Sequence, residues 1–403
     1  MKLIAGGVCA AKGFKASGIH CGIRKNKSKK DLALIVSERK ASAAAVYTQN
    51  LVKGAPIIVT QKNISDGFGR AIICNSGNAN TCNENGIEIA EKMCSLAADA
   101  LNMEAEDIIV ASTGVIGKNL DIEPIEKGMQ YLCDSLGNKS SEAAKAILTT
   151  DTKEKEIAVA FFLGDKECHI GGIAKGSGMV HPNMATILVF ITCDVAITPL
   201  LLQKAVSEDV ENSFNMITVD GDTSTNDMLC VLANGAAENK LIDCDNEDYE
   251  IFKKALSFIT TTLSKEIAAD GEGASKLLEC RVKGAYNKHI AKTVAKAVVG
   301  SSLVKAAMFG QDANWGRILC AIGYSGAMVD VNKIAVDFSS LSGSIAVCND
   351  GKGVTFSEEK AKKILSEKEI VINIDLNSGT SEATAWGCDL TYEYVKINGD
   401  YRT

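Results

Sequence analysis

The sequence has few of the residues that mark fibrous, disordered or disulfide-stapled chains. It contains 4 prolines among 403 residues, aromatic side chains make up only 5%, and its 35 glycines are too few for collagen. Hydrophobic residues at 46% and charged residues at 23% are ordinary globular proportions. The composition therefore excludes a fibre or a disordered chain, and the length predicts one large domain or two intimate ones.

A long hydrophobic run is also absent. The longest strongly apolar run, Ala185–Cys193, is far shorter than the roughly twenty residues that cross a bilayer, and Asp194 ends it. The first ten residues resemble a signal peptide only superficially, because their apolar part is short, contains two glycines and leads into Lys12. We therefore expect a cytoplasmic protein that does not contact membranes.

An excess of positive charge is lacking too. The 43 Lys and Arg residues stand against 50 Asp and Glu residues, which gives a net charge of -7. Nucleic-acid binding depends on basic side chains that release counterions from phosphates, so we expect no nucleic-acid partner.

Motifs for metals and nucleotides are missing. The 14 cysteines include no CxxC pair and the 4 histidines have no zinc-ligand spacing, so we interpret the thiols as buried and free. The segments Gly271–Lys276 and Gly114–Lys118 lack the spacing of a dinucleotide fingerprint or a P-loop. The acidic loop Asp220–Asp227 lacks the glycine and glutamate that a calcium loop needs, and direct substrate contact stays open for it. We predict neither a cofactor nor a metal.

Short apolar, β-branched runs alternate with stretches of helical periodicity throughout the chain. Ser140 or Ser141 is a candidate N-cap for one of the helices. No fixed-period repeat or flexible linker is present, and a fold whose sheets are covered on both faces fits best. The pattern predicts strands at 31–38, 55–61, 69–75, 106–112, 185–197, 280–286, 333–338, 344–348 and 369–374, and helices at 86–101, 140–148, 200–214 and 248–269.

Thr186 lies in KGSGMVHPNMATILVF, residues 175–190, at the start of an apolar run. A threonine hydroxyl is a weak nucleophile, but cleavage of the Ala185–Thr186 bond would free an α-amine to act as its base. That amine has a pKa of about 7.7 to 8, so it is partly unprotonated at neutral pH. Taken alone, the pattern is more typical of a threonine selected for its β propensity, so spacing and pattern do not establish this chemistry.

A second hydroxyl-bearing segment follows a predicted strand. Ser112, Thr113 and Gly114 form a sharp strand exit that could direct a hydroxyl and a backbone N–H at one point, as an oxyanion site does. An ordinary Thr-Gly turn is the alternative interpretation.

These residues resemble a known family, the ornithine acetyltransferases, also called glutamate N-acetyltransferases, of the cyclic arginine-biosynthesis pathway. The resemblance runs from end to end of the chain. His181, where the family motif usually has a small residue, is not expected to act as a base, because the freed amine fills that role. The matching motifs are 12–37, NSGNAN at 75–80, ASTGVIG at 111–117, TTDT at 149–152, KGSGMVHPNMATIL at 175–188, ITVDGDTSTND at 217–227, DGEGASK at 270–276, DANWGRIL at 312–319 and the terminal NGDYRT.

The resemblance implies an α+β fold, a layered αββα-type sandwich with a smaller C-terminal α/β region. It implies self-cleavage between Ala185 and Thr186 into chains 1–185 and 186–403, which assemble as two copies of each. Thr186 would then carry the acetyl group from N-acetylornithine to glutamate, with release of ornithine and N-acetylglutamate. No cofactor or metal is implied.

By the same resemblance, Thr113 and Gly114 stabilise the oxyanion. The resemblance also leaves open whether acetyl-CoA is a second acetyl donor. Two other functions stay open: a hydrolase that passes the acyl group to water, and an uncleaved, non-catalytic amino-acid-binding protein. The residues that match the family's substrate-binding positions are Thr152, Lys175, Thr186, Glu272, Asn398 and Thr403.

Overall fold

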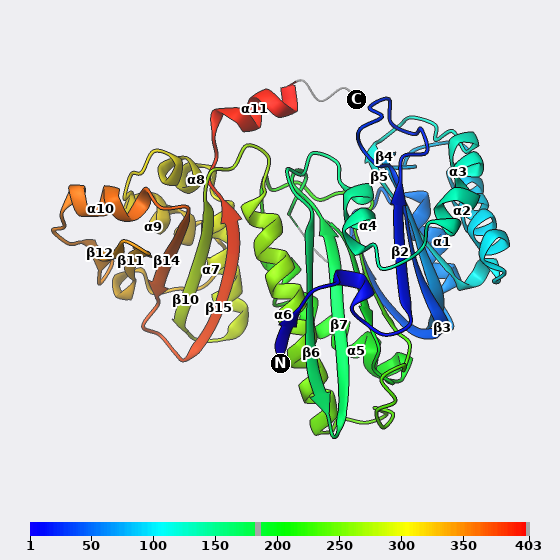
Figure 1. The fold of residues 1–403 in the computed structure, drawn as a ribbon. Coiled ribbons are helices and arrows are strands. Elements are labelled where there is room, and N and C mark those ends of the chain that lie inside the picture. Colours follow the sequence, from blue (N-terminus) through cyan, green and yellow to red (C-terminus); the bar gives the residue numbers. More distant parts are fainter. Residues whose placement is uncertain (182–186, 400–403) are drawn as a thin grey trace.

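The structure is a computed structural model that describes residues 1–181 and 187–399 (Figure 1). Its described strands form two sheets. The first sheet contains β1 (Lys2–Ile4), β2 (Phe14–Ile19), β3 (Leu32–Tyr47), β4 (Phe68–Asn78), β5 (Ile108–Val115), β6 (Lys155–Leu163), β7 (Lys166–Lys175), β8 (Leu188–Cys193) and β9 (Met228–Ala233). The second contains β10 (Leu277–Ala285), β11 (Ala335–Ser340), β12 (Gly343–Asn349), β13 (Lys352–Gly353), β14 (Glu369–Asp375) and β15 (Ser381–Cys388).

The long strand β3 folds the first sheet into two leaves. Its residues 32–36 pair with β4, and its residues 42–47 pair with β9. Between these halves the register shifts and the exposed side chains of Glu38, Arg39 and Lys40 interrupt the apolar pattern. One leaf therefore contains β2, the first half of β3, β4 and β5, and the other contains the second half of β3 with β9, β8, β7, β6 and β1.

The two leaves bury one hydrophobic cluster between them. Ile35 and Ile72 come from the first leaf, Phe190 and Leu232 from the second, and α4 (Ser140–Ile147) adds Ile147. Burial of this much apolar surface is the main force that holds the leaves together.

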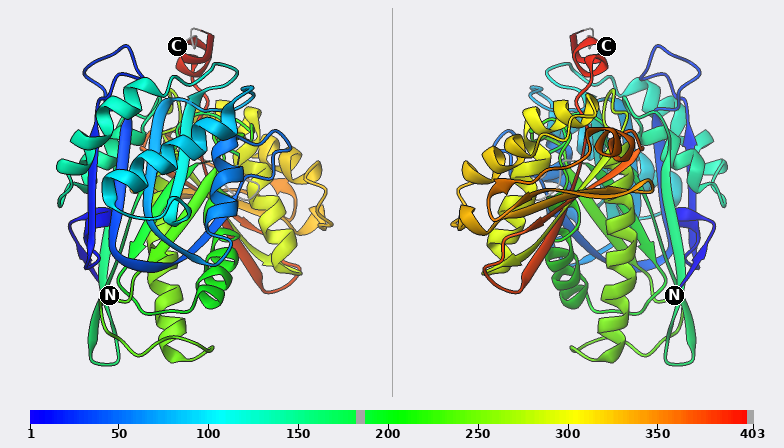
Figure 2. Two further views of the ribbon diagram at one scale, coloured as in Figure 1. Left: turned by 90° about the vertical axis from the view of Figure 1, so that its right-hand side faces the viewer. Right: turned by 90° about the vertical axis from the view of Figure 1, so that its left-hand side faces the viewer.

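Helices cover the outer face of each leaf. On the first leaf, α2 (Gly86–Leu101) and α3 (Glu123–Asp134) contribute Met93 and Met129 to a second cluster, and α1 (Ala55–Asn63) packs beside them. On the other leaf, α5 (Pro199–Val210) and α6 (Glu247–Ala269) contribute Val206 and Ile259 to a third. The order of layers is α, β, β, α, which confirms the predicted sandwich (Figure 2).

The second sheet forms the predicted smaller C-terminal region (Figure 1). Its strand order is β13-β12-β11-β14-β10-β15, with β10 and β14 parallel. One face of the sheet is buried, and α6 lies between the two sheets, sharing its core with both. The remaining helices are α7 (Lys288–Gly300), α8 (Ser302–Phe309), α9 (Trp315–Gly323), α10 (Glu358–Leu365) and the terminal α11 (Tyr392–Gly399).

Two local predictions are wrong. Residues 55–61 form helix α1 instead of a strand, since Pro56 occupies the first turn, where a missing N–H costs nothing, and the exposed residues Ile58 and Gln61 are three positions apart, as on one face of a helix. The N-cap of α4 is Lys139, without a side-chain cap. The Ser140 hydroxyl instead accepts the backbone N–H of Val8 at 3.0 Å.

The other expected helices and strands are present, with shifted ends. The run predicted at 185–197 supplies β8, whose first residue is Leu188. The hairpin of β6 and β7 was not predicted, although its Gly164-Asp165 turn between two apolar runs is a sequence signal for a hairpin.

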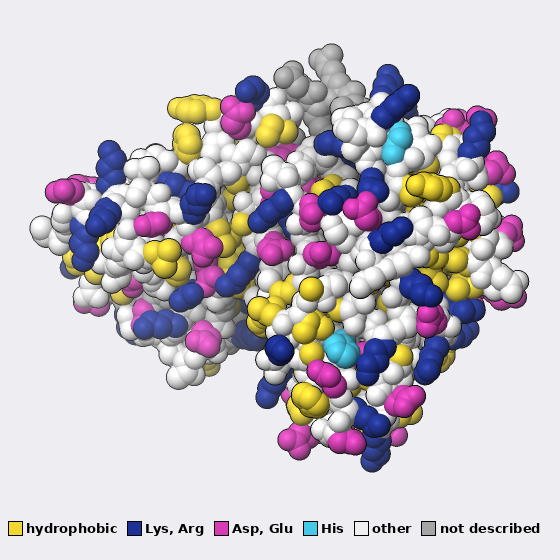
Figure 3. Space-filling model, viewed as in Figure 1, with side chains coloured by type: hydrophobic (Ala, Val, Ile, Leu, Met, Phe, Trp, Pro, Cys, Tyr) yellow, Lys and Arg dark blue, Asp and Glu magenta, His cyan; other side chains and the backbone are white. Residues whose placement is uncertain are grey.

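The surface carries charges of both signs, and most of the cysteines are buried. Figure 3 shows basic and acidic side chains interspersed over one face of the molecule. No helix within residues 1–181 and 187–399 is long and apolar enough to cross a membrane. The cysteines are free and mostly buried, as predicted, and burial raises the pKa of the Cys74 and Cys230 thiols to about 12.

Replacement of Thr60 by Val should destabilise the protein by about 1–3 kcal/mol. The buried Thr60 hydroxyl donates to the Val110 carbonyl at 2.8 Å and accepts the Val110 N–H at 2.9 Å. Loss of the hydroxyl removes this partner from both the N–H and the carbonyl of Val110 in β5. Chemical denaturation would measure the change. Thr262→Val, at a half-buried position in α6 whose hydroxyl bonds only within its own helix, is the control and should change stability by less than about 0.5 kcal/mol.

Candidate functional site

A cavity of about 340 Å³ lies between the ends of β5 and β7, which belong to different leaves. Five residues that the sequence singles out line it: Thr113, Gly114, Lys175, Glu272 and Asn398. They come from four distant parts of the chain. The tertiary structure thus brings together most of the described residues that the family resemblance assigned to the site.

Gly114 is required by the close packing of β4 and β5. Its φ is 132°, and a Cβ atom there would lie 2.4 Å from the carbonyl carbon of Gly77. The register of the two strands shifts at this point, between Gly77 and Asn78. Only glycine fits this close approach of the two strands. The irregular end of β5 that it permits lies at the wall of the cavity, together with the preceding Thr113.

Lys175 is a buried cation at the end of β7. Its Nζ donates to the Thr113 hydroxyl at 3.1 Å, and its residue pairs with Leu188 at the start of β8. Since the Thr113 oxygen accepts from Lys175, the hydroxyl proton of Thr113 is free to point to another acceptor.

Asp227 is a buried acid near Lys175 that the sequence indicated only as part of an acidic loop. Burial raises its pKa well above the ordinary value, an effect that the charge of Lys175 and a hydrogen bond from Ser224 only partly oppose. Its Oδ2 has no hydrogen-bond partner among the described residues. A carboxyl group in this state favours its protonated form.

Three buried charged side chains form a network next to the cavity. This network was not predicted from the sequence. The Lys155 ammonium lies 2.8 Å from Asp151 Oδ1 and 2.6 Å from Asp270 Oδ2, and all three side chains are almost completely buried. Burial alone would raise the pKa of Asp151, but the charges of Lys155 and Lys175 lower it to about 2. The Asp151 carboxylate therefore stays ionised at neutral pH, and it shares the Lys155 cation with Asp270.

This network also fixes the residues that follow Lys175. Asp151 Oδ1 accepts the N–H of Gly176 at 2.7 Å, and the Asp270 carbonyl accepts the Ser177 hydroxyl at 2.7 Å. The Ser177 carbonyl in turn accepts the N–H of Glu272 at 2.9 Å. Lys175 and Glu272 are thus positioned by one connected set of hydrogen bonds.

Thr152 lies beside the cavity but does not line it. Its N–H donates to Asp270 at 3.1 Å, and its hydroxyl donates to the other oxygen of the same carboxylate. The cavity wall here consists of the preceding residues, Thr149 and Thr150.

Glu272 gives the cavity a negative group. Its carboxylate packs against Gly178, where a Cβ atom would lie only 2.3 Å from the carboxylate carbon. The Asn398 side chain donates to Glu272 Oε2 at 2.7 Å. A cation and an anion in one small cavity suit a substrate that carries both charges.

Ala185, Thr186 and Thr403 lie outside the described residues. On one side of the first two, the Ile187 carbonyl accepts the N–H of Met228 at 2.9 Å. On the other side, His181 Nδ1 lies 3.0 Å from the Thr218 hydroxyl. Burial, together with the charge of Lys296, lowers the pKa of His181 to about 4, so its imidazole is a weak base.

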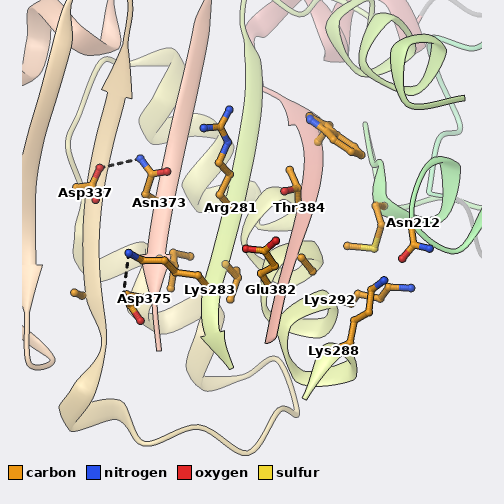
Figure 4. Close-up of a pocket in the computed structure, with 16 residues that line it drawn as sticks. Asn212, Arg281, Lys283, Lys288, Lys292, Asp337, Asn373, Asp375, Glu382 and Thr384 are labelled. Atoms are coloured by element: carbon orange, nitrogen blue, oxygen red, sulfur yellow. Dashed lines mark hydrogen bonds and ion pairs between the residues drawn. The ribbon is translucent and has the colours of Figure 1, made fainter. Parts of the chain in front are cut away.

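A larger cavity, of about 820 Å³, lies on the open face of the second sheet and contains none of the predicted site residues. Figure 4 shows side chains of both charges pointing into it from β10 and β15, with Lys288 and Lys292 of α7 beside them. Lys283 pairs with Asp375 at 3.2 Å. Among the described residues, no group of three or more His, Cys, Asp or Glu side chains could hold a metal ion.

Replacement of Lys155 by Met should destabilise the protein by about 3–5 kcal/mol at neutral pH, because two buried carboxylates lose their shared cation. Chemical denaturation would measure the loss. The control is Lys204→Met, which breaks the exposed Lys204–Asp245 pair and should have little effect.

The effect of Lys155→Met should also depend on pH. The folded-state pKa of Asp151 is depressed, so its ionised form stabilises the wild type above about pH 4, and this contribution is lost as the pH falls towards 2. The difference between variant and wild type should shrink over this range. A difference that is constant down to pH 2 would contradict the assignment.

The chain is similar to proteins of one known family. A model of the ArgJ family matches residues 15–403. The arginine biosynthesis bifunctional protein ArgJ of Caldanaerobacter subterraneus subsp. tengcongensis is 49% identical over 405 residues, with 100% of both chains covered. ArgJ 1 of Clostridium acetobutylicum is 51% identical over 395 residues, covering 97% of this chain and 96% of that one.

A solved structure is also similar. The arginine biosynthesis bifunctional protein argJ from Bacillus halodurans is 47% identical with a TM-score of 0.51, and the match covers 53% of this chain and 98% of that chain. Matches at this identity over the full length confirm the resemblance that the motifs indicated. The chain belongs to the ArgJ family.

Proposed function

We propose that this protein transfers the acetyl group of N2-acetyl-L-ornithine to L-glutamate in arginine biosynthesis. The observation that carries the proposal is the cavity in which Thr113, Gly114, Lys175, Glu272 and Asn398 meet beside the start of β8. Membership of a family whose members are named arginine biosynthesis proteins supports it.

The nucleophile in this proposal is Thr186, freed by cleavage of the Ala185–Thr186 bond. Its hydroxyl oxygen attacks the acetyl carbonyl while its own α-amine takes the proton. Ornithine leaves with that proton on its amine, and the acetyl group remains on Thr186 as an ester. The amine of glutamate then attacks the ester, N-acetylglutamate leaves, and the threonine hydroxyl regains its proton.

Thr113 and Gly114 would stabilise the negative charge that develops on the acetyl oxygen. The Thr113 hydroxyl is prepared to donate because its oxygen already accepts from Lys175. The neighbouring Gly114 N–H would be the second donor. Fixed donors of this kind act strongly in a cavity with little water, because they need no reorganisation during the reaction.

Charged side chains would select the amino-acid part of the substrate. Glu272 suits an ammonium group, and Lys175, which is buried beside it in the same cavity, suits a developing or permanent negative charge. We assign Asn398, Thr152 and Thr403 to the same substrate site by their match to the family motifs. The hydrogen bond from Asn398 to Glu272 supports the first of these assignments.

Cleavage at residue 185 would leave both products in one sheet. β8 and β9, from the chain 186–403, lie between β7 and β3 of the chain 1–185. The products would therefore stay associated through backbone hydrogen bonds and a shared core. The solved relative supports two separate chains, because a match to 53% of this protein covers 98% of its length.

The proposal extends to the donor, the assembly and the location. The word bifunctional in the relatives' names supports acetyl-CoA as a second acetyl donor. We further propose that no cofactor or metal takes part, that two copies of each chain assemble, and that the enzyme is cytoplasmic. An assay with acetyl-CoA and glutamate tests the second acetyl donor. A gel-filtration mass for the cleaved enzyme tests the assembly.

Thr186→Ala should remain one chain of 403 residues and lose acetyl transfer, because the variant has no hydroxyl for cleavage or for the acyl-enzyme. Intact mass and N-terminal sequencing would detect the products, which in the wild type should include a chain that begins Thr-Ile-Leu-Val. Cleavage of the variant at the same bond would refute the mechanism. In the wild type, acetate release without N-acetylglutamate in excess glutamate would instead identify a hydrolase.

Thr113→Val should lower kcat by about 10²- to 10³-fold, the usual effect of removing one oxyanion donor. The substitution keeps the shape of the side chain and removes only the hydroxyl. Steady-state kinetics on fully cleaved enzyme would measure it, with Thr262→Val as the control for a distant threonine. A kcat within threefold of wild type would exclude Thr113 from the oxyanion site.

A further inference from the structure

The Asp220 carboxylate joins three segments at the mouth of the cavity. Its Oδ2 accepts the N–H of Met179 at 2.6 Å, and its Oδ1 accepts the N–H of Val180 at 2.9 Å. The Tyr394 hydroxyl of α11 donates to Oδ2 at 3.3 Å. The acidic loop thus uses one of its aspartates to hold backbone and the C-terminal helix at once.

Met179 has a backbone conformation that needs such support. Its φ is 56°, in the left-handed region that residues with a Cβ seldom adopt, and its side chain lines the cavity. The next residue is held from both sides, because the Val180 carbonyl accepts the N–H of Val219 at 2.6 Å. Asp220 therefore fixes a strained residue in the wall of the substrate cavity.

The helix α11 is attached mainly through polar contacts, since none of its residues is buried. Tyr394 reaches Asp220, and Asn398, one turn further along, reaches Glu272 at 2.7 Å. The Thr391 hydroxyl, just before the helix, donates to the Gly273 carbonyl at 2.6 Å. Figure 1 shows α11 at the top of the molecule, beyond the ends of the strands of both sheets.

The Tyr394 hydroxyl remains a donor over a wide pH range. Burial, and next the nearby negative charge of Asp220, raise the pKa of this phenol above its ordinary value. The phenol therefore keeps the proton with which it donates to the Asp220 carboxyl group at 3.3 Å.

We propose that Asp220 is a positioning residue that couples the docking of α11 to the conformation of Met179 and Val180, and thereby sets the affinity of the cavity for its substrate. This inference deepens the proposed function and rests on it. Asp220 touches no reacting atom in this scheme. It acts through the cavity wall on one side and through the helix that carries Asn398 on the other.

Tyr394→Phe tests the coupling by removing one hydroxyl. We expect KM for N-acetylornithine to rise about fivefold while kcat stays within twofold, because the helix docks less firmly and the chemical groups are unchanged. Amide hydrogen exchange in 392–399 should become faster, and exchange at Met179 and Val180 should rise with it. The matched control is Tyr392→Phe on the same helix, whose exposed ring only packs against Phe309 and should leave KM unchanged.

Asp220→Asn tests the other end of the contact, with Asp222→Asn as the matched control. Asp222 is an exposed acid of the same loop whose side chain makes no hydrogen bond or ion pair with the described residues, so its substitution should leave both readouts at wild-type values. Asp220→Asn keeps the size of the side chain but presents one acceptor fewer, and should raise KM more than Tyr394→Phe does.

Three results in Tyr394→Phe would each overturn the inference. These are an unchanged KM, exchange at the wild-type rate throughout, and faster exchange confined to 392–399 without any change at Met179 and Val180. Hydrogen exchange needs no turnover, so it separates the two proposals. A wild type that transfers no acetyl group refutes the proposed function, whereas normal exchange in Tyr394→Phe refutes the coupling.

Discussion

The geometry of the site depends on one buried cation, Lys155, that two carboxylates share. The Lys155 ammonium lies within 2.8 Å of both Asp151 and Asp270, and its charge, together with that of Lys175, lowers the pKa of Asp151 to about 2. The Asp151 carboxylate also holds Gly176, and the backbone of Asp270 holds Ser177. Lys175 directly precedes these two residues, and the N–H of Glu272 donates to the Ser177 carbonyl. The buried ion-pair network therefore positions both Lys175 and Glu272 in the cavity wall.

The cavity wall contains conformations that most side chains could not adopt. Gly114 leaves no space for a Cβ atom against Gly77, and Met179 has a positive φ despite its side chain. Such strain is kept only where neighbouring groups fix it, as the strand pairing of β4 and β5 does for Gly114 and the Asp220 carboxylate does for Met179. Both positions adjoin groups to which we assign a role in substrate binding or catalysis.

Local patterns predicted most of the regular structure, and their failures have identifiable causes. Alternation and β-branched residues located β4 and β5, and helical periodicity located α2 and α6. The run at 55–61 was misassigned because a short, mostly apolar run is typical of both a buried strand and a largely buried helix, and the proline in its first turn favours the helix. Thr152 matches a family position, yet its hydroxyl bonds Asp270, a partner 118 residues away that no local pattern indicates.

The sequence by itself determined the family, through motifs that resemble it from end to end of the chain, and this resemblance implied the layered α+β class and the site positions Thr113, Gly114, Lys175 and Glu272. Only the tertiary structure decided that β3 divides one sheet into two leaves, that Lys155 pairs with Asp270 as well as with the neighbouring Asp151, and that Asp220 meets Tyr394. The physical reason is sequence separation. Contacts between residues more than a hundred positions apart depend on how the whole chain packs, and this packing leaves little trace in the local pattern of either partner.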